Sequence, residues 1–148
     1  MSNRGTYHNA PTFKGLVAMS GAVDKAGLDP LIYELIKMRG SQINGCSFCL
    51  NMHIEDALKL GESQQRINLL SLWRDTPLFS ERERAALALT EAVTLISENH
   101  VPDDVFNEAR RLFSEDEIAD ITMAIVTINA WNRMNITFGI EVQEPVAV

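Results

Sequence analysis

Cysteine is almost absent from this chain, since only two of its 148 residues are cysteines. They are Cys46 and Cys49, so a disulfide within one chain can join only these two. Structural disulfides usually close much longer loops, and a reducing cytosol keeps thiols reduced. A single pair of cysteines at CxxC spacing therefore indicates redox chemistry or metal binding rather than a structural disulfide.

The chain also lacks a long apolar run and an excess of positive charge. Its uncharged stretch Ile121–Asn132 contains Thr and Asn and is shorter than the about 20 apolar residues that span a bilayer. Residues 1–12 are polar and carry no secretory signal. The formal net charge of −7 disfavours contact with phosphate backbones, which requires clustered cations. We expect a cytoplasmic protein that binds neither membranes nor nucleic acid.

Strand-like alternation of apolar and polar residues is missing as well. Apolar residues recur at helical spacing, and 46% of the residues are hydrophobic, which is enough for a sizeable core. We predict an all-helical fold with a single domain over residues 1–148 and about six to seven helices.

Capping residues and helix-breaking residues indicate where the helices begin and end. The helix starts are predicted by Asp29 before Pro30, Asn44, Ser63, and the capping boxes Ser80/Glu83 and Ser114/Glu117. The predicted helices cover about 13–26, 30–43, 45–60, 63–73, 80–97, a shorter segment from 101, and 114–138, with Gly139 after the end of the last helix. The CxxC then lies in the first turns of the third helix.

The third helix brings both cysteines and a histidine onto one face. Cys46, Cys49 and His53 share this face, and side chains lean toward the helix N-terminus, so His53 reaches back toward Cys49. The helix dipole instead favours a thiolate at Cys46, in the first turn. A nearby histidine can accept the thiol proton or hold the thiolate by charge. These arguments leave the choice of nucleophile open.

Glu34, on the preceding helix, has apolar neighbours one turn away on both sides, Leu31 and Met38. A carboxylate in such a stripe can pass protons if a histidine or water is within reach. The alternative is a surface pair between Glu34 and Lys37.

The cysteine pair has other interpretations. Both sulfurs could simply pack in the core. Zinc could bind Cys46, Cys49, His53 and Glu34, although structural zinc sites usually have two separated ligand pairs. Haem attachment is excluded, because Leu50 stands where the histidine would have to follow the second cysteine.

The run from Glu34 to His53 resembles the active-site signature of the alkylhydroperoxidase D-like family, within the carboxymuconolactone decarboxylase superfamily. That family has a glutamate twelve residues before the first cysteine, the second cysteine three residues later, and a histidine four residues after that, as here. Segments 78–87 and 128–133 also resemble segments of small family members. The resemblance implies an all-helical fold that assembles into homotrimers or homohexamers and reduces hydroperoxides with thiols.

The resemblance also implies the residue roles. Cys49 would be the peroxidatic thiol, Cys46 the resolving thiol, and Glu34 and His53 a proton relay that needs no metal, flavin or other cofactor. Phe48 is a departure, because the best-known peroxidase branch has a histidine just before the second cysteine. The apolar ring removes a polar group beside the sulfur and could narrow the pocket.

Partners follow from the same resemblance. The substrate would be a hydroperoxide, and the electrons would come from an external dithiol such as a lipoylated protein or a thioredoxin-like donor; some relatives support a peroxiredoxin. One alternative is a redox-sensing dithiol switch with little turnover. Another is a lactone decarboxylase or isomerase of the same superfamily, although those enzymes generally lack this CxxC.

Several residues outside this cluster receive structural interpretations. We expect Glu91 to be a hydrogen-bonded structural carboxylate with Arg133 or Arg84 as its partner. His8 and His100 lie in polar segments and are expected to be solvated and outside the site. The two tryptophans, Trp73 and Trp131, and the methionines are expected in the core or in subunit contacts.

Overall fold

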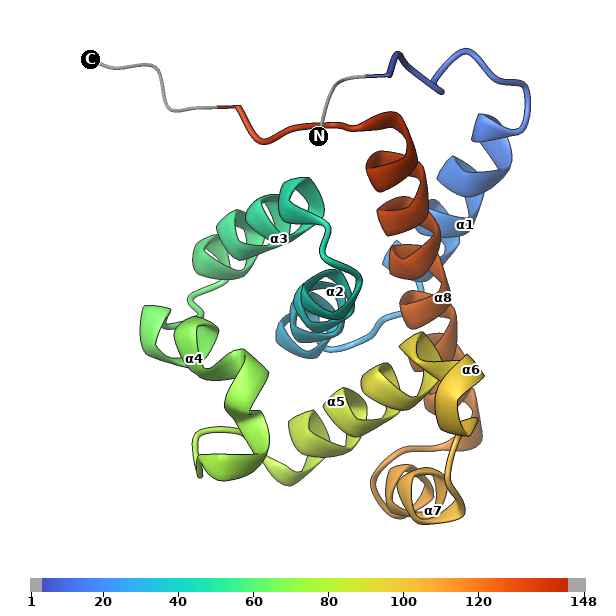
Figure 1. Ribbon diagram of the computed structural model, residues 1–148. Coiled ribbons are helices and arrows are strands. Elements are labelled where there is room, and N and C mark those ends of the chain that lie inside the picture. The colour runs from blue at the N-terminus through green and yellow to red at the C-terminus, as the bar shows by residue number, and fades with distance from the viewer. Residues whose placement is uncertain (1–3, 144–148) are drawn as a thin grey trace.

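The computed structural model describes residues 4–143. Within this range all regular structure is helical, as predicted, with eight α-helices and one 3₁₀ helix (Figure 1). The elements are α1 (Phe13–Asp24), α2 (Pro30–Asn44), α3 (Ser47–Lys59), α4 (Gln64–Leu69), η1 (Leu70–Asp75, the 3₁₀ helix), α5 (Glu81–Thr94), α6 (Ile96–Asn99), α7 (Asp103–Leu112) and α8 (Glu115–Phe138). The single domain over 1–148 stays a prediction, and residues 1–3 and 144–148 of it lie outside the described range.

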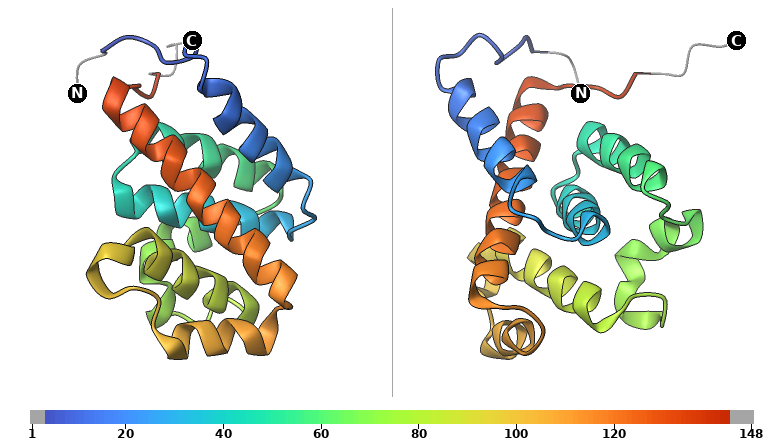
Figure 2. Two further views of the ribbon diagram at one scale, coloured as in Figure 1. Left: turned by 90° about the vertical axis from the view of Figure 1, so that its right-hand side faces the viewer. Right: turned by 180° about the vertical axis from the view of Figure 1, so that it is seen from behind.

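Helix α2 occupies the centre of the arrangement, and other helices surround it (Figure 1). It packs against α3, α5 and α8, and α1 lies along α8 (Figure 2). Helix α7 packs across α5 and near the start of α8. Because α2 touches both α3 and α8, side chains from three helices can meet at one place.

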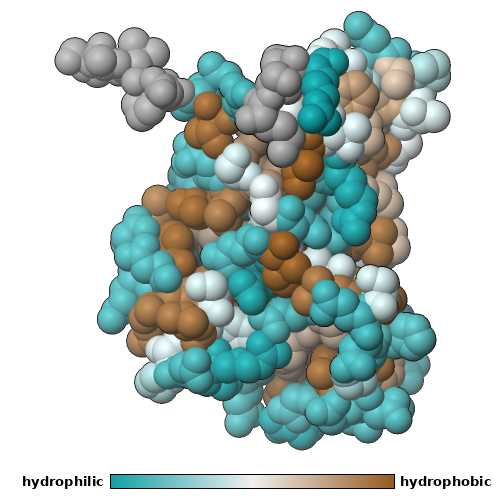
Figure 3. All heavy atoms as spheres, in the orientation of Figure 1, coloured by the Kyte–Doolittle hydropathy of each residue, from teal (hydrophilic) through white to brown (hydrophobic). Residues whose placement is uncertain are grey.

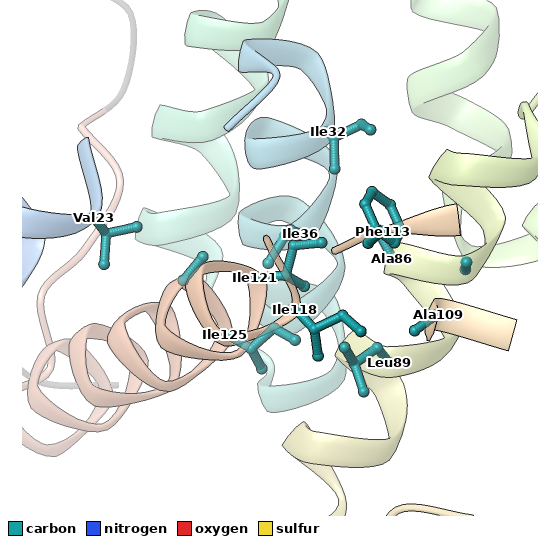
Figure 4. Close-up of a cluster of buried hydrophobic side chains, with 12 residues drawn as sticks. Val23, Ile32, Ile36, Ala86, Leu89, Ala109, Phe113, Ile118, Ile121 and Ile125 are labelled. Carbon is teal, nitrogen blue, oxygen red and sulfur yellow. The ribbon is translucent and has the colours of Figure 1, made fainter. Parts of the chain in front are cut away.

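The largest group of buried apolar side chains lies where α2, α5, α7 and α8 converge (Figure 4). Ile36 of α2 and Ile121 and Ile125 of α8 are fully buried there, and Leu89 of α5 packs beside them. Burying a side chain of this size contributes about 1.5–3 kcal/mol. This core fixes α2 against α8, the two helices that flank the cysteine pair.

Most predicted helix starts are confirmed. Asp29 accepts hydrogen bonds from the first-turn amides of α2, and Ser63 caps α4. Both capping boxes form, at Ser80 before α5 and at Ser114 before α8. The 24-residue helix α8 ends at Phe138 and is closed by Gly139 in the left-handed region, as predicted.

Other boundaries differ from the predictions. The segment predicted as one helix over 63–73 is α4 followed by the 3₁₀ helix η1. The helix predicted over 80–97 is interrupted at Leu95, whose φ and ψ of −100° and 32° leave the helical region. These two breaks explain why the structure has more helices than predicted.

No helix of residues 4–143 is long and apolar enough to cross a membrane. On the face in Figure 3, hydrophobic residues form separate patches between hydrophilic ones. Isolated exposed apolar side chains of this kind are normal on protein surfaces.

Candidate active site

The cysteine pair begins helix α3. Gly45 adopts the left-handed conformation, with φ of 72°, and ends α2, so the chain turns sharply. Cys46 is then the N-cap of α3, and its Sγ accepts a hydrogen bond from the amide of Cys49 at 3.3 Å. The two sulfurs form a disulfide, with the Cα atoms 5.4 Å apart.

The prediction that Asn44 caps the third helix is wrong. Asn44 is the last residue of α2, and its side-chain amide donates to Asn129 and Asn132 of α8 at 3.0 and 2.9 Å. The left-handed Gly45 separates the two helices, so α3 starts at Ser47 rather than at position 45. Asn44 therefore ties the α2–α3 turn to α8.

This placement changes the electrostatic comparison of the two sulfurs. Cys46 precedes the helix as its cap, whereas Cys49 lies in the first turn. The free amides of a helix N-terminus stabilise negative charge there. The dipole thus acts at both sulfurs and does not single out Cys46.

Glu34 and His53 form a buried pair between α2 and α3. Their exposed fractions are 6% and 7%, and His53 Nδ1 lies 3.0 Å from Glu34 Oε2. The other carboxylate oxygen, Oε1, lies 2.6 Å from Lys37 Nζ. The carboxylate is thus buried, as the apolar stripe predicted, and it also pairs with Lys37, although this pair is largely buried rather than at the surface. The cation compensates the buried charge.

A cavity of about 410 Å³ opens beside this pair. Cys49 and His53 both line it, together with the apolar side chains of Phe48, Met52 and Trp131. Because Nδ1 of His53 faces Glu34, proton exchange with a molecule in the cavity would fall to Nε2. Of the four sequence-predicted residues, Cys49 and His53 therefore lie at the cavity wall, and Cys46 and Glu34 are bonded to them without lining the cavity.

Sequence reasoning missed two polar residues at this site. Asn135 of α8 donates a hydrogen bond from Nδ2 to Cys49 Sγ at 3.3 Å, and the Tyr7 hydroxyl donates to Asn135 Oδ1 at 2.8 Å. Both are buried. A signal was present in the sequence, since Asn129, Asn132 and Asn135 recur at helical spacing in the last predicted helix.

The prediction that His8 stays outside the site is wrong. The segment before α1 crosses the cavity, so His8 lines it together with Tyr7. His8 remains exposed, and its Nδ1 lies 2.7 Å from Thr6 Oγ1. His100 is exposed beyond α6, as predicted. Trp73 is in the core as predicted. Trp131 is partly buried against the cluster of Cys46, Cys49 and Ile128, and it also lines the cavity.

The zinc set proposed from the sequence is not available in this state, because the disulfide removes both thiolates. In residues 4–143 a different group, Glu34, His53 and Asp56, has ligand atoms within 4.8 Å of one another. Its carboxylates are already paired with cations, Glu34 with Lys37 and Asp56 with Lys59. The two carboxylates are therefore balanced by lysines rather than left free to bind a metal ion.

Glu91 has the structural role predicted for it, with different partners. It accepts hydrogen bonds from Arg39 Nε at 2.8 Å and Trp73 Nε1 at 2.9 Å, and it pairs with Arg74. Arg84 and Arg133 bond elsewhere, to backbone carbonyls of 73–76 and to Asn129. The predicted partners were wrong because helix contacts not visible in the sequence bring Arg39 closer.

Comparison with known proteins decides the family. The family model described as Carboxymuconolactone decarboxylase family matches residues 10–92. This chain belongs to the carboxymuconolactone decarboxylase family. The uncharacterised protein YdfG of Bacillus subtilis (strain 168) is 40% identical over 141 residues, which are 94% of this chain and 96% of YdfG.

Solved structures confirm the fold predicted from the resemblance. A protein of unknown function from Agrobacterium tumefaciens, considered a candidate antioxidant defence protein AhpD, superposes with a TM-score of 0.92 at 43% identity, covering 99% of this chain and 100% of its own. An uncharacterised peroxidase-related protein from Silicibacter sp. TM1040 has a TM-score of 0.76 at 24% identity over 88% of this chain and 70% of its own, and shows the fold alone.

The carboxymuconolactone decarboxylase match includes part of the site and leaves part of it out. Glu34, both cysteines and His53 fall inside residues 10–92, whereas Tyr7 and Asn135 fall outside. The site of this family member is thus completed by its first described segment and its last helix.

Proposed function

We propose that this protein is a thiol-dependent peroxidase that reduces alkyl hydroperoxides or hydrogen peroxide. The observation that carries the proposal is the Cys46–Cys49 disulfide beside the buried Glu34–His53 pair, with Cys49 and His53 lining one cavity. A dithiol supplies two electrons, and the pair beside it can move the protons that peroxide cleavage requires.

In the first step the Cys49 thiolate attacks the terminal oxygen of the hydroperoxide. The O–O bond breaks, Cys49 becomes a sulfenic acid, and the alkoxide leaves. His53 delivers a proton to the leaving oxygen, and Glu34 holds the imidazole and restores its proton. The assignment to Cys49 is supported by its place in the cavity wall.

In the second step the Cys46 thiol attacks the sulfenic sulfur. The S–S bond forms and one water leaves. The Cα separation of 5.4 Å in the disulfide is within the usual range for such bonds. An external dithiol then reduces the bond by exchange and returns the enzyme to its starting state.

Several partners complete the proposal. The reductant is a lipoylated protein or a thioredoxin-like dithiol donor, and a peroxiredoxin is a further partner. The chain assembles as a homotrimer or homohexamer. The A. tumefaciens protein supports an antioxidant role, since it matches this chain over its full length. Phe48 beside Cys49 makes the cavity wall apolar and favours organic hydroperoxides over hydrogen peroxide.

The test is a thiol count and an intact mass on fully reduced, metal-free protein, before and after one equivalent of alkyl hydroperoxide. We expect both thiols to disappear with the loss of two hydrogens, and repeated consumption of peroxide once a dithiol such as dihydrolipoamide is supplied. Survival of both thiols would overturn the proposal. A single oxidation without turnover would instead identify a dithiol switch.

A further inference from the structure

We infer that Asn135 is an additional catalytic residue, which stabilises the Cys49 thiolate by a hydrogen bond, and that Tyr7 is the residue that positions it. The inference rests on the proposed function, because it names the group that activates the sulfur in that reaction. It also extends the site beyond the Glu34–His53 motif to α8 and to the segment before α1.

The contact between Asn135 and Cys49 is direct and buried. Nδ2 of Asn135 lies 3.3 Å from Cys49 Sγ, within hydrogen-bond distance for sulfur. Asn135 and Cys49 are 5% and 1% exposed. An amide N–H that meets a sulfur away from water stabilises the thiolate more than the neutral thiol, because hydrogen bonds to charged groups are the stronger ones.

Tyr7 decides which way the amide of Asn135 points. Its hydroxyl donates to Oδ1 at 2.8 Å, so the oxygen faces Tyr7 and the NH₂ group faces the sulfur. Reversal of the amide would place Oδ1, an acceptor, against a thiolate. Burial raises the pKa of Tyr7, so the hydroxyl keeps its proton and remains a donor.

The segment that carries Tyr7 is held against α8 by a backbone hydrogen bond and by packing of the Tyr7 ring. The Arg4 amide donates to the carbonyl of Phe138 at 2.8 Å. The Tyr7 ring packs against the rings of Phe13, Trp131 and Phe138, with centroid separations of 5.7, 6.4 and 5.3 Å. The hydroxyl is thus delivered to Asn135 by packing and does not depend on the hydrogen bond alone.

Other charged and titratable groups also surround Cys49. Those lining the cavity, or bonded to a group that lines it, are His8, Asp24, Tyr33, Glu34, Lys37 and His53. Five of these six groups are paired with one another. Glu34 holds both His53 and Lys37, and Tyr33 donates to Asp24 at 3.0 Å. Asn135 adds a neutral donor at the sulfur itself, and its removal changes no charge in the cavity.

The test measures the pKa of the Cys49 thiol from its thiolate absorbance, in the full chain with Cys46→Ser so that one thiol remains. Serine is a preferred N-cap, so this background keeps the start of α3. We expect Asn135→Ala to raise the thiol pKa by about one to two units. Asn135→Asp should raise it further, because a carboxylate of similar shape repels the thiolate. Tyr7→Phe, which keeps the ring and loses the hydroxyl, should raise it by less than Asn135→Ala.

Asn132→Ala is the matched control. Asn132 is a fully buried amide one turn earlier in α8, and it bonds Ser41 at 3.0 Å and Asn44 at 2.9 Å without contacting the sulfur. This variant should lose stability and leave the thiol pKa unchanged. An unchanged pKa in both Asn135→Asp and Tyr7→Phe would overturn the inference. An equal rise in Asn132→Ala would overturn it too, by indicating a general loosening of α8.

The inference about Asn135 and the proposed peroxidase function can be refuted independently of each other. The pKa is read without peroxide, so a protein that consumes no hydroperoxide would contradict the proposed function while the pKa series still reported on Asn135. If Asn135→Ala does not fold, Tyr7→Phe carries the same test, since it removes only one hydroxyl.

Discussion

Cys46 and Cys49 differ in what surrounds them, although three residues separate them in sequence. Cys46 lies outside the helix and accepts the amide of Cys49, whereas Cys49 lines the cavity and receives the side-chain amide of Asn135. The surroundings of Cys49 favour a nucleophile, and those of Cys46 favour a sulfur that closes the disulfide afterwards.

Serine substitutions of the two cysteines should separate these roles. We expect Cys49→Ser to abolish peroxide consumption, because no thiolate then faces the cavity. Cys46→Ser should still allow one oxidation, which stops at the sulfenic acid of Cys49 because no resolving thiol is present. Trapping with a sulfenate-reactive dione, read by intact mass, checks both outcomes. Undiminished turnover by either variant would contradict the mechanism.

At the scale of elements, the turn between α2 and α3 positions the disulfide. Its conformation depends on Gly45, whose φ of 72° is in the left-handed region. Apart from Gly45 itself and its two chain neighbours, no heavy atom lies within 4 Å of the position where a Cβ would stand. A side chain there would therefore cost backbone energy without a steric clash.

We predict that Gly45→Ala lowers the free energy of unfolding by about 1–2 kcal/mol, the cost of a non-glycine residue in the left-handed conformation. Chemical denaturation of the oxidised protein measures it. Gly21→Ala is the control, because Gly21 lies inside α1 and also has open space at its Cβ position. That variant should gain about 0.5–1 kcal/mol from higher helix propensity. If the two substitutions changed the free energy of unfolding equally, the left-handed conformation of Gly45 would not be the cause of the loss.

At the scale of the whole molecule, Glu91 connects three elements. It lies on α5 and bonds Arg39 of α2 and Trp73 and Arg74 of η1. Burial alone would raise the pKa of Glu91, but the hydrogen bonds from Trp73, Arg74 and Arg39 outweigh it and hold the pKa below its ordinary value of 4.5. The ionised carboxylate therefore stabilises the fold.

A group whose pKa is lower in the folded state contributes stability above its ordinary pKa and loses it as the pH falls. We predict that Glu91→Gln lowers the free energy of unfolding by about 1–3 kcal/mol at neutral pH. The difference from the unsubstituted protein should shrink below pH 4.5, the ordinary pKa of this carboxyl. Thermal unfolding across this range is the measurement, with the exposed Glu55→Gln as control. A difference that does not change with pH would contradict the prediction.

Local signals made much of the helix pattern predictable. The Ser114–Glu117 box and Gly139 fixed both ends of α8, because these residues satisfy the free amides and carbonyls of a helix end whatever packs around it. The pairing of His53 with Glu34 was less accessible. Periodicity placed each residue on a face of its own helix, and only the packing of α2 against α3 brought the two faces together.

The sequence by itself determined the all-helical class and most helix ends, because these depend on spacing and on interactions within a few residues. It also singled out Glu34, Cys46, Cys49 and His53 as candidate site residues. Tertiary structure alone decided the partners of Glu91, the position of His8 and the hydrogen bonds from Tyr7 to Asn135 and from Asn135 to Cys49. Tyr7 and Asn135 are separated by 128 residues. A contact of that separation depends on how the helices pack in three dimensions, which no local pattern in the chain records.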